Sequence, residues 1–415
     1  MECVPDALRR IEQTTCCVVG GGPAGMMLGL LLARAGVSVT VLERHDDFLR
    51  DFRGDTVHAS TLTLLDELGL GERFAALPHR VLERIQLPFS AGRSLELDLS
   101  RLRGPHPHIA MVPQWDLLDL LADAAAREPT FTLRMGVDVT GVVRERGRVV
   151  GVRHRDRDGR EGELRAALTV ACDGRASTVR AAAGLPVREF GVPSDVWWFR
   201  LPRVTGDPHG LGVRAGVGAL LVAIDRGSYF QLGYTIRKGS DAELREGGIQ
   251  AFRQRVARLE PRFAERVDAI ASWDDVKLLS VRLNRMRRWF APGLLCIGDA
   301  AHAMSPVGGV GINLAVQDAV CAARCLAPSL LRGERVRTRE LARVQARRWA
   351  PTALTQSLQR LAHRSVIGPA LAGDVSRAGR FVGVLRRVPA PRRLAARLFA
   401  NGVLPEHAPW FACRP

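Results

Sequence analysis

The sequence predicts a mixed α/β fold, α+β in parts, in which an α/β domain is interrupted by an inserted antiparallel sheet and followed by C-terminal helices. Three observations predict this fold. Residues 16–44 show the order strand, glycine turn, helix and strand that opens a βαβ unit. Two further apolar runs, 167–172 and 294–297, end in Asp-Gly and Gly-Asp. Between them, the strand-like runs 220–225 and 228–236 are separated by Arg-Gly, as in a hairpin.

The opening unit has clear element boundaries. Cys16–Val19 is a short apolar run, and the glycine turn that follows it leads into an apolar helix over Met26–Ala35 that ends at Gly36. Val37–Leu42 is rich in β-branched residues and ends at Glu43, as a buried second strand would. The remaining elements follow the same patterns: a helix over 60–70, strands over 80–100, a helix from Gln114, paired strands over 131–155, and helices over 247–266 and 312–326.

The order of these patterns predicts a first domain that is discontinuous in sequence. The 179–279 block has the character of an antiparallel sheet with one helix, and the chain beyond 336 is mostly helical and rich in arginine. The expected division is therefore a first domain in three parts (1–75, 105–178 and 280–335), an inserted domain in two parts (76–104 and 179–279) and a C-terminal helical region (336–415).

The net charge of +17 does not by itself indicate a nucleic-acid-binding protein. All basic residues except Lys238 and Lys277 are arginines, and they are scattered along the chain with few aromatic residues among them. We therefore expect no nucleic-acid partner, although the charge favours anionic partners such as a phosphorylated cofactor.

Targeting, membrane and metal signals are weak in this sequence. The N-terminus carries Glu2, Asp6 and Glu12 without an apolar core, which argues against a signal peptide. No uninterrupted apolar stretch is long enough to span a bilayer, so an integral membrane protein is not expected. Cys321 and Cys325 lie one helical turn apart, but no second pair completes a zinc site, and we expect small buried thiols, no metal and a cytoplasmic location.

The first candidate site is the pattern Gly20-x-Gly22-x-x-Gly25, which becomes specific because it follows a strand and opens a helix. Gly20 permits the tight turn, Gly22 lets the backbone approach a pyrophosphate, and Gly25 lets helix and strand pack closely. The helix start would offer free N–H groups to the phosphates. Glu43 ends the next strand, 18 positions after Gly25, where a carboxylate would accept hydrogen bonds from a ribose.

Two later strands also end in candidate site residues. Asp173-Gly174 follows one of them, and Gly298-Asp299 follows the other. Open α/β sheets bind ligands outside the carboxyl ends of their strands, so three strand ends are expected to converge on one crevice. Asp-Gly alone also suits a simple turn, whereas Asp299 after a buried strand is the stronger indication of a ligand or partner.

A second glycine loop, Pro306-Val307-Gly308-Gly309-Val310-Gly311, leads into a helix that begins with Ile312 and Asn313. Such a loop can expose several N–H groups, and the helix start can stabilise a developing negative charge like that of a reduced flavin. A flexible connector is the alternative, which the apolar flanking residues make less favourable.

Taken in this order over residues 16–330, the four sites resemble the flavin-dependent aromatic hydroxylases of the para-hydroxybenzoate hydroxylase type. The resemblance implies a Rossmann-like FAD-binding domain with an inserted antiparallel-sheet substrate domain. It assigns Gly20, Gly22, Pro23, Ala24 and Gly25 to the pyrophosphate, Glu43 to the ribose, Arg44 to the adenine end, Arg53 and Gln114 to cofactor contacts, Asp173 and Gly174 to FAD and the NAD(P)H passage, Gly298 and Asp299 to the ribityl chain, and Pro306, Gly309, Gly311, Ile312 and Asn313 to the flavin ring.

The family reaction implies NADPH or NADH as co-substrate and an aromatic small molecule as substrate. Family members reduce the flavin, add oxygen to form a flavin C4a-hydroperoxide, and hydroxylate an electron-rich ring in a pocket closed to water. Arg53, Pro306 and His58 are the candidate catalytic residues, although His58 and Asp55 also suit plain loop positions. His302, beside Asp299, is expected to be structural.

The substrate pocket is less well determined by the sequence than the cofactor site. Tyr229 and Tyr234 do not match the tyrosines that position a phenol in the family. Trp197 and Trp198 should face opposite sides of one strand, so at most one of them lines the pocket. The oligomeric state and the choice between NADH and NADPH are left open.

Other functions remain possible on the same fold. They are epoxidation, Baeyer–Villiger insertion, dehydrogenation and halogenation, although the Trp-x-Trp-x-Ile-Pro signature of flavin halogenases is absent. A different class of function, a membrane-surface or partner-binding flavoprotein, would use the basic stretch 380–397 as an amphipathic helix. The prolines in that stretch favour a covering helix instead.

Overall fold

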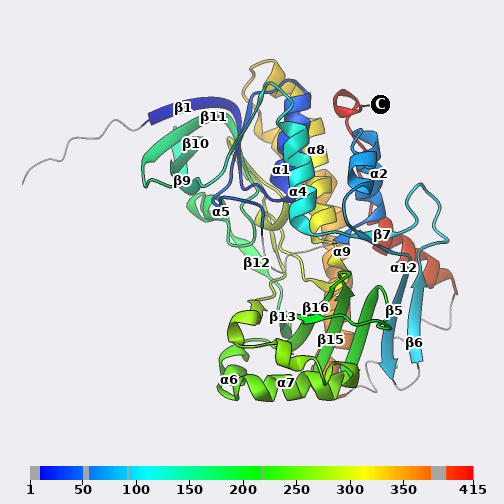
Figure 1. Ribbon diagram of the computed structural model, residues 1–415. Helices are drawn as coiled ribbons and strands as arrows, with labels where there is room; N and C mark the ends of the chain where they lie inside the picture. Colours follow the sequence, from blue (N-terminus) through cyan, green and yellow to red (C-terminus); the bar gives the residue numbers. More distant parts are fainter. Residues whose placement is uncertain (1–9, 50–55, 91–92, 217, 375–388, 415) are drawn as a thin grey trace, which may run out of the picture.

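The largest sheet of the computed structural model has eight strands, and the parallel ones among them carry the residues predicted to bind a cofactor (Figure 1). The structure describes residues 10–49, 56–90, 93–216, 218–374 and 389–414. Neighbouring strands are parallel through the centre of the sheet, in the order β20 (Leu294–Cys296), β11 (Glu161–Ala171), β1 (Arg10–Val19), β2 (Val39–Leu42) and β8 (Phe131–Arg134). The antiparallel strands β9 (Asp138–Glu145), β10 (Arg148–Arg155) and β19 (Phe290–Ala291) complete it.

The register of the sheet brings the ends of its central strands to one level. Val19 at the end of β1 lies opposite Leu42 in β2 and Ala171 in β11. Ala171 in turn lies opposite Cys296, the last residue of β20. The residues that follow these four strands therefore leave the sheet at the same edge, as the sequence predicted for three of them.

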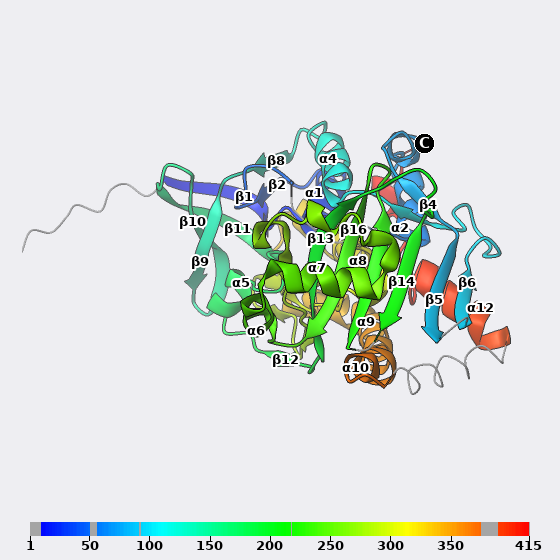
Figure 2. The same ribbon diagram turned by 60° about the horizontal axis from the view of Figure 1, so that its bottom comes forward.

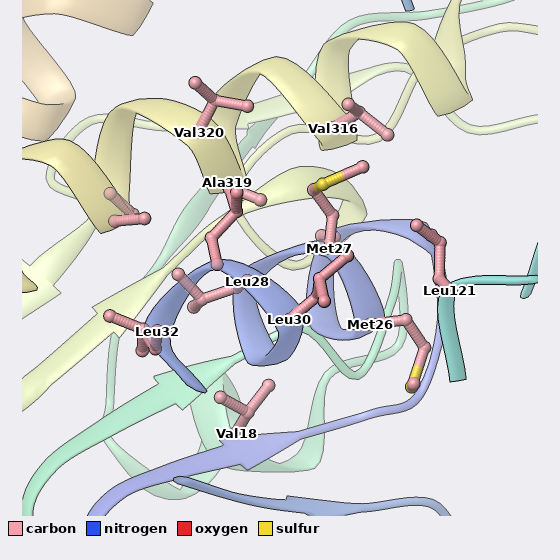
Figure 3. Packing of buried hydrophobic residues seen from close by; sticks show 14 of the residues in the cluster. Val18, Met26, Met27, Leu28, Leu30, Leu32, Leu121, Val316, Ala319 and Val320 are labelled. Carbon is pink, nitrogen blue, oxygen red and sulfur yellow. The ribbon is translucent and has the colours of Figure 1, made fainter. Parts of the chain in front are cut away.

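Helices from three distant parts of the chain pack together over this sheet (Figure 1). The helix α1 (Pro23–Arg34) is buried along almost its whole length against α4 (Gln114–Ala125) and α8 (Gly311–Leu331). Figure 3 shows Met27 and Leu28 of α1 directed toward Val316 and Ala319 of α8, with Val18 of β1 on the opposite side of α1. The shared core fixes the start of α8 relative to the start of α1.

A separate five-stranded antiparallel sheet lies below the main sheet in Figure 1, with α6 (Asp241–Glu246) and α7 (Gly248–Leu259) against one of its faces. Trp197 is fully buried against Phe252 of α7, whereas Trp198 belongs to a cluster on the other face, so the two indoles face opposite sides as predicted. The sheet order is β14 (Leu211–Gly216), β15 (Ala219–Asp225), β16 (Tyr229–Arg237), β13 (Ser194–Pro202) and β17 (Lys277–Leu279), and the β15–β16 hairpin is confirmed.

Shorter elements connect and cover the two large sheets. Those that lie where the sequence predicted strands or helices are α2 (Ala59–Glu67), β4 (Arg80–Leu82), β5 (Arg84–Ser90), β6 (Arg93–Asp98), α9 (Thr338–Ala362), α10 (Gly368–Leu371) and α12 (Pro389–Asn401). The residue patterns did not indicate β3 (Thr56–Val57), α3 (Gly71–Ala75), β7 (Ile109–Met111), α5 (Thr178–Ala182), β12 (Val187–Glu189) and β18 (Asn284–Met286).

The expected helices differ from the structure in several places, and α8 continues to Leu331, beyond its expected end at 326. The helix predicted over 247–266 ends at Leu259, because Pro261 cannot continue it and short 3-10 turns follow. Between α9 and α10, residues His363–Ile367 form a π-helical turn that the residue pattern did not indicate. The first part of the basic stretch 380–397 lies outside the described residues, and the rest belongs to α12, which packs against α2 and β6.

One helix of the described chain is long and apolar enough on average to cross a membrane: α8 with the turn before it, Val307–Leu331. Asp318 and Arg324 interrupt its apolar sequence, and most of its residues are buried inside the protein. We therefore interpret α8 as the central core helix that Figure 3 shows.

The packing of α1 on α8 predicts a large cost for truncating Met27, whose side chain is fully buried. Met27→Ala should lower the free energy of unfolding by about 2–5 kcal/mol, because it leaves a cavity in the shared core. Leu354→Ala, at a position that is 44% exposed on α9, is the control and should change it by less than about 1 kcal/mol. Urea unfolding followed by circular dichroism measures both, and equal effects would contradict the proposed packing.

Candidate functional site

The glycine turn after β1 packs directly on the end of β11. Gly20 has a φ of +101°, and a Cβ at this position would lie 2.5 Å from the carbonyl oxygen of Cys172. A Cβ on Gly25 would lie 1.9 Å from the carbonyl oxygen of Gly20. Only glycine fits at these two positions, so the turn and the first helical turn stay in close contact with the sheet.

The same turn is open on the side of Gly22. A Cβ at Gly22 would meet nothing within 4 Å, unlike one at Gly20 or Gly25. Pro23 begins α1 and Ala24 follows it, with no side chain capping the helix and no acidic residue in its first turn. The N–H groups at the start of α1 therefore face an uncrowded space that can receive a phosphate group.

A second helix start lies beside the first. Gly298, after β20, has a φ of +58°, and its Cβ would approach the Cβ atoms of Ala24 at 3.2 Å and of Ala315 at 3.3 Å. Ala24 belongs to the first turn of α1 and Ala315 to the second turn of α8. No side chain caps α8 either, so the N–H groups of Gly311, Ile312 and Asn313 in its first turn are available for a ligand.

Glu43 is buried at the end of β2 and is held in place before any ligand binds. Its carboxylate accepts hydrogen bonds from the backbone N–H of Gly21 at 2.8 Å and from both the backbone and the ring of His45. Burial acts to raise the pKa of Glu43, but these hydrogen bonds outweigh it and leave the pKa lowered. The group is thus an ionised acceptor beside the glycine turn, while the adjacent Arg44 is exposed.

The carboxylate of Asp173 is used inside the protein. It accepts hydrogen bonds from the hydroxyl of Ser177 at 2.5 Å and from the backbone N–H of Val179 at 3.0 Å, and so shapes the turn that leads into α5. Burial raises its pKa despite these bonds. Gly174 has a φ of +80° and open space where a side chain would be, so the turn presents backbone at the sheet edge.

Asp299 is the most exposed carboxylate at this edge, with 30% of its side chain accessible. Arg175 contacts it at 3.4 Å from the loop after β11. The buried Arg180 donates to the carbonyl oxygens of Ala300 at 2.8 Å and of Arg175 at 3.0 Å, and so ties the loops after β11 and β20 together. Neither arginine stands out in the sequence, because Asp299 and Ala300 lie more than 100 residues away from them in the chain.

Behind Asp299 lies a buried ionic cluster centred on Asp318 of α8. Its carboxylate accepts hydrogen bonds from the backbone N–H of Gly298 at 3.1 Å, Nε2 of His302 at 2.6 Å and Nε of Arg348 at 3.0 Å. Burial alone would raise the pKa of Asp318, but His302 and Arg348 outweigh it and leave the pKa lowered. His302 is therefore part of the support for the Gly298 turn, in line with the structural role expected for it.

The second glycine loop is held from both sides. Gly308 and Gly309 have φ values of +83° and +62°, which favour glycine. Thr56 donates to the carbonyl oxygen of Gly309 at 2.6 Å, and Gln359 of α9 donates to that of Val307 at 2.8 Å. Pro306 precedes these residues and is exposed, so the loop presents one free edge.

His58 is fully buried between this loop and α12. Its Nδ1 lies 2.7 Å from the carbonyl oxygen of Phe399, and its Nε2 lies 3.1 Å from that of Gly309. Burial lowers the pKa of His58, although the backbone carbonyls act to raise it. His58 thus connects the loop to α12. A residue that transfers a proton at this loop would also have to lie in such a position.

The remaining candidate residues are placed as follows. The side chain of Asn313 accepts hydrogen bonds from Ser60 at 2.9 Å and Thr61 at 2.5 Å, so it joins α8 to α2 and leaves its own backbone N–H free for a ligand. Gln114 is half-buried at the first position of α4. Arg53 and Asp55 lie outside the described residues.

The face of the antiparallel sheet opposite α7 approaches the glycine loop through apolar side chains. Trp198 lies over Gly233, where an added Cβ would come within 3.1 Å of the indole ring. It clusters with Val222 and with Phe399 of α12, whose ring lies 3.3 Å from a Cβ built at Gly308. An apolar, partly aromatic lining therefore adjoins the loop that carries Pro306.

These features fit an FAD molecule in extended form. The two uncapped helix starts and the open glycine turn offer N–H groups for the pyrophosphate and for the flavin, and the ionised Glu43 offers an acceptor for the ribose. The strand ends that carry these groups are aligned by the sheet register.

Comparison with known proteins agrees with this geometry. Residues 13–357 match the model of the family described as "FAD binding domain". The chain is 35% identical over 387 residues, 90% of its own length and 92% of the relative, to 6-methylpretetramide 4-monooxygenase of Streptomyces rimosus. Its fold matches OxyS anhydrotetracycline hydroxylase from Streptomyces rimosus with a TM-score of 0.76 and 24% identity, covering 96% of this chain and 77% of OxyS. It also matches PqsL, a probable FAD-dependent monooxygenase from Pseudomonas aeruginosa, with a TM-score of 0.74 and 22% identity, covering 90% of this chain and all of PqsL.

The Asp318 cluster predicts an acid-sensitive contribution to stability. A carboxyl whose pKa is lowered on folding stabilises the protein above its ordinary pKa of about 3.9, and this stabilisation is lost as the pH falls through the folded value. Asp318→Asn should therefore lower the free energy of unfolding by about 3 kcal/mol at pH 7, because it leaves the buried guanidinium of Arg348 without the anion that it contacts at 3.0 Å.

Urea unfolding of the wild type and of Asp318→Asn at pH 7, 5, 4 and 3 measures this difference, which should shrink below pH 4. Asp138→Asn, at an exposed position of β9, is the control. A difference that stays constant from pH 7 to pH 3 would show that the charge of Asp318 is not the source of its effect.

Asp299→Ala should weaken FAD binding at least about tenfold, the loss expected for one charge-assisted hydrogen bond, while the protein stays folded. Flavin content after gel filtration and titration of the apoprotein with FAD measure the effect. Asp138→Ala serves as the matched control. Full retention of FAD by Asp299→Ala would remove Asp299 from the cofactor site.

Proposed function

This chain belongs to the FAD-binding domain family of FAD-dependent aromatic monooxygenases, and on that premise we propose that it hydroxylates a polycyclic aromatic, polyketide-like small molecule with O2 and NAD(P)H as co-substrates. One observation carries this proposal: the chain is related over nearly its full length to a named monooxygenase, and it has a site that fits FAD. The 35% identity to 6-methylpretetramide 4-monooxygenase extends over nine-tenths of both chains, so it includes the antiparallel sheet as well as the cofactor-binding part.

The lining beside the glycine loop supports a flat aromatic substrate. Trp198, Val222 and Phe399 offer apolar surface from the sheet and from α12. Because Gly233 has no side chain, the indole of Trp198 packs close to the backbone of the sheet at this position. An aromatic ring system would stack on such a lining and would be held near Pro306.

We assign the cofactor-binding roles as follows, on the support of the geometry above. When bound, FAD that has been reduced by NAD(P)H supplies the activation of O2 and the transfer of one oxygen atom to the substrate. Gly20, Gly22, Pro23, Ala24 and Gly25 would hold the pyrophosphate, Glu43 and Arg44 the adenosine half, Arg53, Gln114, Asp173, Gly174, Gly298 and Asp299 the central part, and Pro306, Gly309, Gly311, Ile312 and Asn313 the flavin ring.

The chain's own residues would contribute positioning, charge stabilisation and exclusion of water. The start of α8 directs N–H groups and a positive dipole end at the place where the flavin would carry negative charge. Phe399 and His58 hold α12 against Gly308 and Gly309, which covers this side of the loop. Arg53, Pro306 and His58 stay our proposed catalytic residues, with His58 either passing a proton or maintaining this cover.

A cytoplasmic location is part of the same proposal. NAD(P)H is available there, and free thiols persist in a reducing compartment. The described cysteines are free, and Cys16, Cys17 and Cys296 are fully buried.

The function is tested with the purified protein and a panel of phenols and polycyclic aromatic polyketides. The protein should be yellow and release FAD on denaturation. A true substrate should accelerate NADPH or NADH oxidation at least about tenfold, because a pocket closed to water couples reduction to oxygen transfer. Under 18O2, the product mass should rise by one labelled oxygen atom.

Other outcomes would identify another activity. A colourless protein that does not take up added FAD would overturn the assignment altogether. Product formation with no gain of labelled oxygen would replace hydroxylation by dehydrogenation. Insertion of oxygen between two carbon atoms, seen by fragmentation of the product, would indicate a Baeyer–Villiger reaction.

A further inference from the structure

A second cavity lies on the side of the antiparallel sheet that carries α6 and α7, outside the site described above. Figure 2 shows these helices lying across the sheet, with α10 near its end. The cavity has a volume of about 860 Å³, within the range of small-molecule sites. The N–H of Gly218 donates to the carbonyl oxygen of Ala370 at 3.1 Å and joins the β14–β15 hairpin to α10 along its border.

The cavity is separated from the proposed flavin site by packed side chains. Leu220, Ile367 and Ala370 form a small buried cluster, against which Val307 of the glycine loop and Leu371 are packed. Leu371 lines the cavity, whereas Val307 does not. A molecule in the cavity would therefore occupy a different place from the flavin and from a substrate beside Pro306.

Tyr234 lines this cavity with an aromatic side chain that carries a hydroxyl. Only 8% of Tyr234 is exposed, and its ring packs in the aromatic core, with Phe252 at 5.6 Å and Trp197 at 6.4 Å between centroids. Its hydroxyl forms no hydrogen bond with the residues that the structure describes, and Tyr234 is one of the residues that line the cavity. A rigidly held hydroxyl that opens into a cavity is a ready hydrogen-bond donor for a ligand.

Three arginines surround the same space without a carboxylate partner. Across the described ranges, no ion pair or side-chain hydrogen bond engages the guanidinium groups of Arg237, Arg255 or Arg258, although most arginines on this sheet and its helices are paired. Burial raises the pKa of the Tyr234 hydroxyl, whereas Arg255 and Arg258 act to lower it, so both guanidinium groups lie near this hydroxyl. Glu243 is the single acidic side chain among the lining residues, so the cavity carries a net positive charge.

Apart from Thr235 and Ser240, the rest of the lining is apolar side chains and glycine. Ile236, Leu244 and Leu259 supply one wall, and Leu371 and Ala372 of the α10 segment supply the other. Such a lining stabilises a hydrophobic body, while unpaired guanidinium groups and a phenol hydroxyl bind oxygen atoms with negative charge. The combination selects molecules that have both features.

We propose that this cavity is a second binding site, for a small amphipathic organic acid with a flat apolar body and a carboxylate. The apolar body lies on Leu244 and Leu259, and the carboxylate lies between Arg255 and Arg258 and accepts a hydrogen bond from Tyr234. Binding here requires neither NAD(P)H nor turnover, so it stands or falls separately from the proposed hydroxylation.

The test uses naphthalene-2-carboxylate as the probe, titrated into the FAD-loaded protein in a calorimeter, with naphthalene-2-carboxamide as its uncharged isostere. The wild type should bind the carboxylate at one site with a higher affinity than the amide, by at least about tenfold, because only the acid forms charge-assisted hydrogen bonds. The double variant Arg255→Gln/Arg258→Gln should lose at least about tenfold in affinity for the acid and little for the amide.

Two further variants refine the interpretation. Tyr234→Phe keeps the ring in the aromatic core and should weaken binding of the acid about three- to tenfold, the loss of one hydrogen bond. Arg339→Gln removes the same charge from an exposed position of α9 and should leave the affinity unchanged. Unchanged binding by the double variant, equal binding of acid and amide, or equal losses in Arg339→Gln and the double variant would each overturn the proposal.

Discussion

The architecture depends on one buried carboxylate. Asp318 lies in the middle of an apolar core helix, and its oxygens accept hydrogen bonds from the Gly298 turn, from His302 and from Arg348 of α9. Without these donors a charge at this depth would be costly, so the helix, the turn and α9 can coexist only in this arrangement. The arrangement holds Asp299 at the sheet edge and brings the start of α8 beside the start of α1, which creates the place where a dinucleotide fits.

Few side chains fill the space beside the starts of α1 and α8, and this is what suits it to a cofactor. Glycines occupy the points of closest backbone approach, both helices begin without a cap, and the strands end at one level. Backbone N–H groups are therefore the main surface offered to a cofactor, and they need no rearrangement to receive negative charge. The antiparallel sheet contributes an apolar surface instead of a polar one: its face adjoins the loop and suits an aromatic substrate.

Local patterns allowed much of this to be predicted from sequence, and long-range pairings account for what was missed. The βαβ opening and the β15–β16 hairpin depend on neighbouring residues, so their patterns were sufficient. Asp173 stays a proposed cofactor residue, yet its carboxylate also shapes its own turn through Ser177 and Val179, a role that its sequence position alone does not reveal. An aspartate inside the apolar sequence of α8 was a visible anomaly, yet its partner Arg348 could not be chosen among so many arginines. The fold class and the family resemblance are confirmed, while the individual site residues remain proposals.

The position of His58 lets two carbonyl oxygens, of Phe399 in α12 and of Gly309 in the glycine loop, compete for one ring N–H. A neutral imidazole carries a single N–H, yet each ring nitrogen of His58 faces a carbonyl oxygen. The tautomer that donates to Phe399 leaves a lone pair toward Gly309, and the other tautomer does the reverse. Thr56 also donates to Gly309, so the loop keeps a bond in either case, whereas this contact to α12 exists in only one. A tautomer change within a single ring thus sets how firmly the terminal helix is attached, with no movement of the backbone that carries the ring.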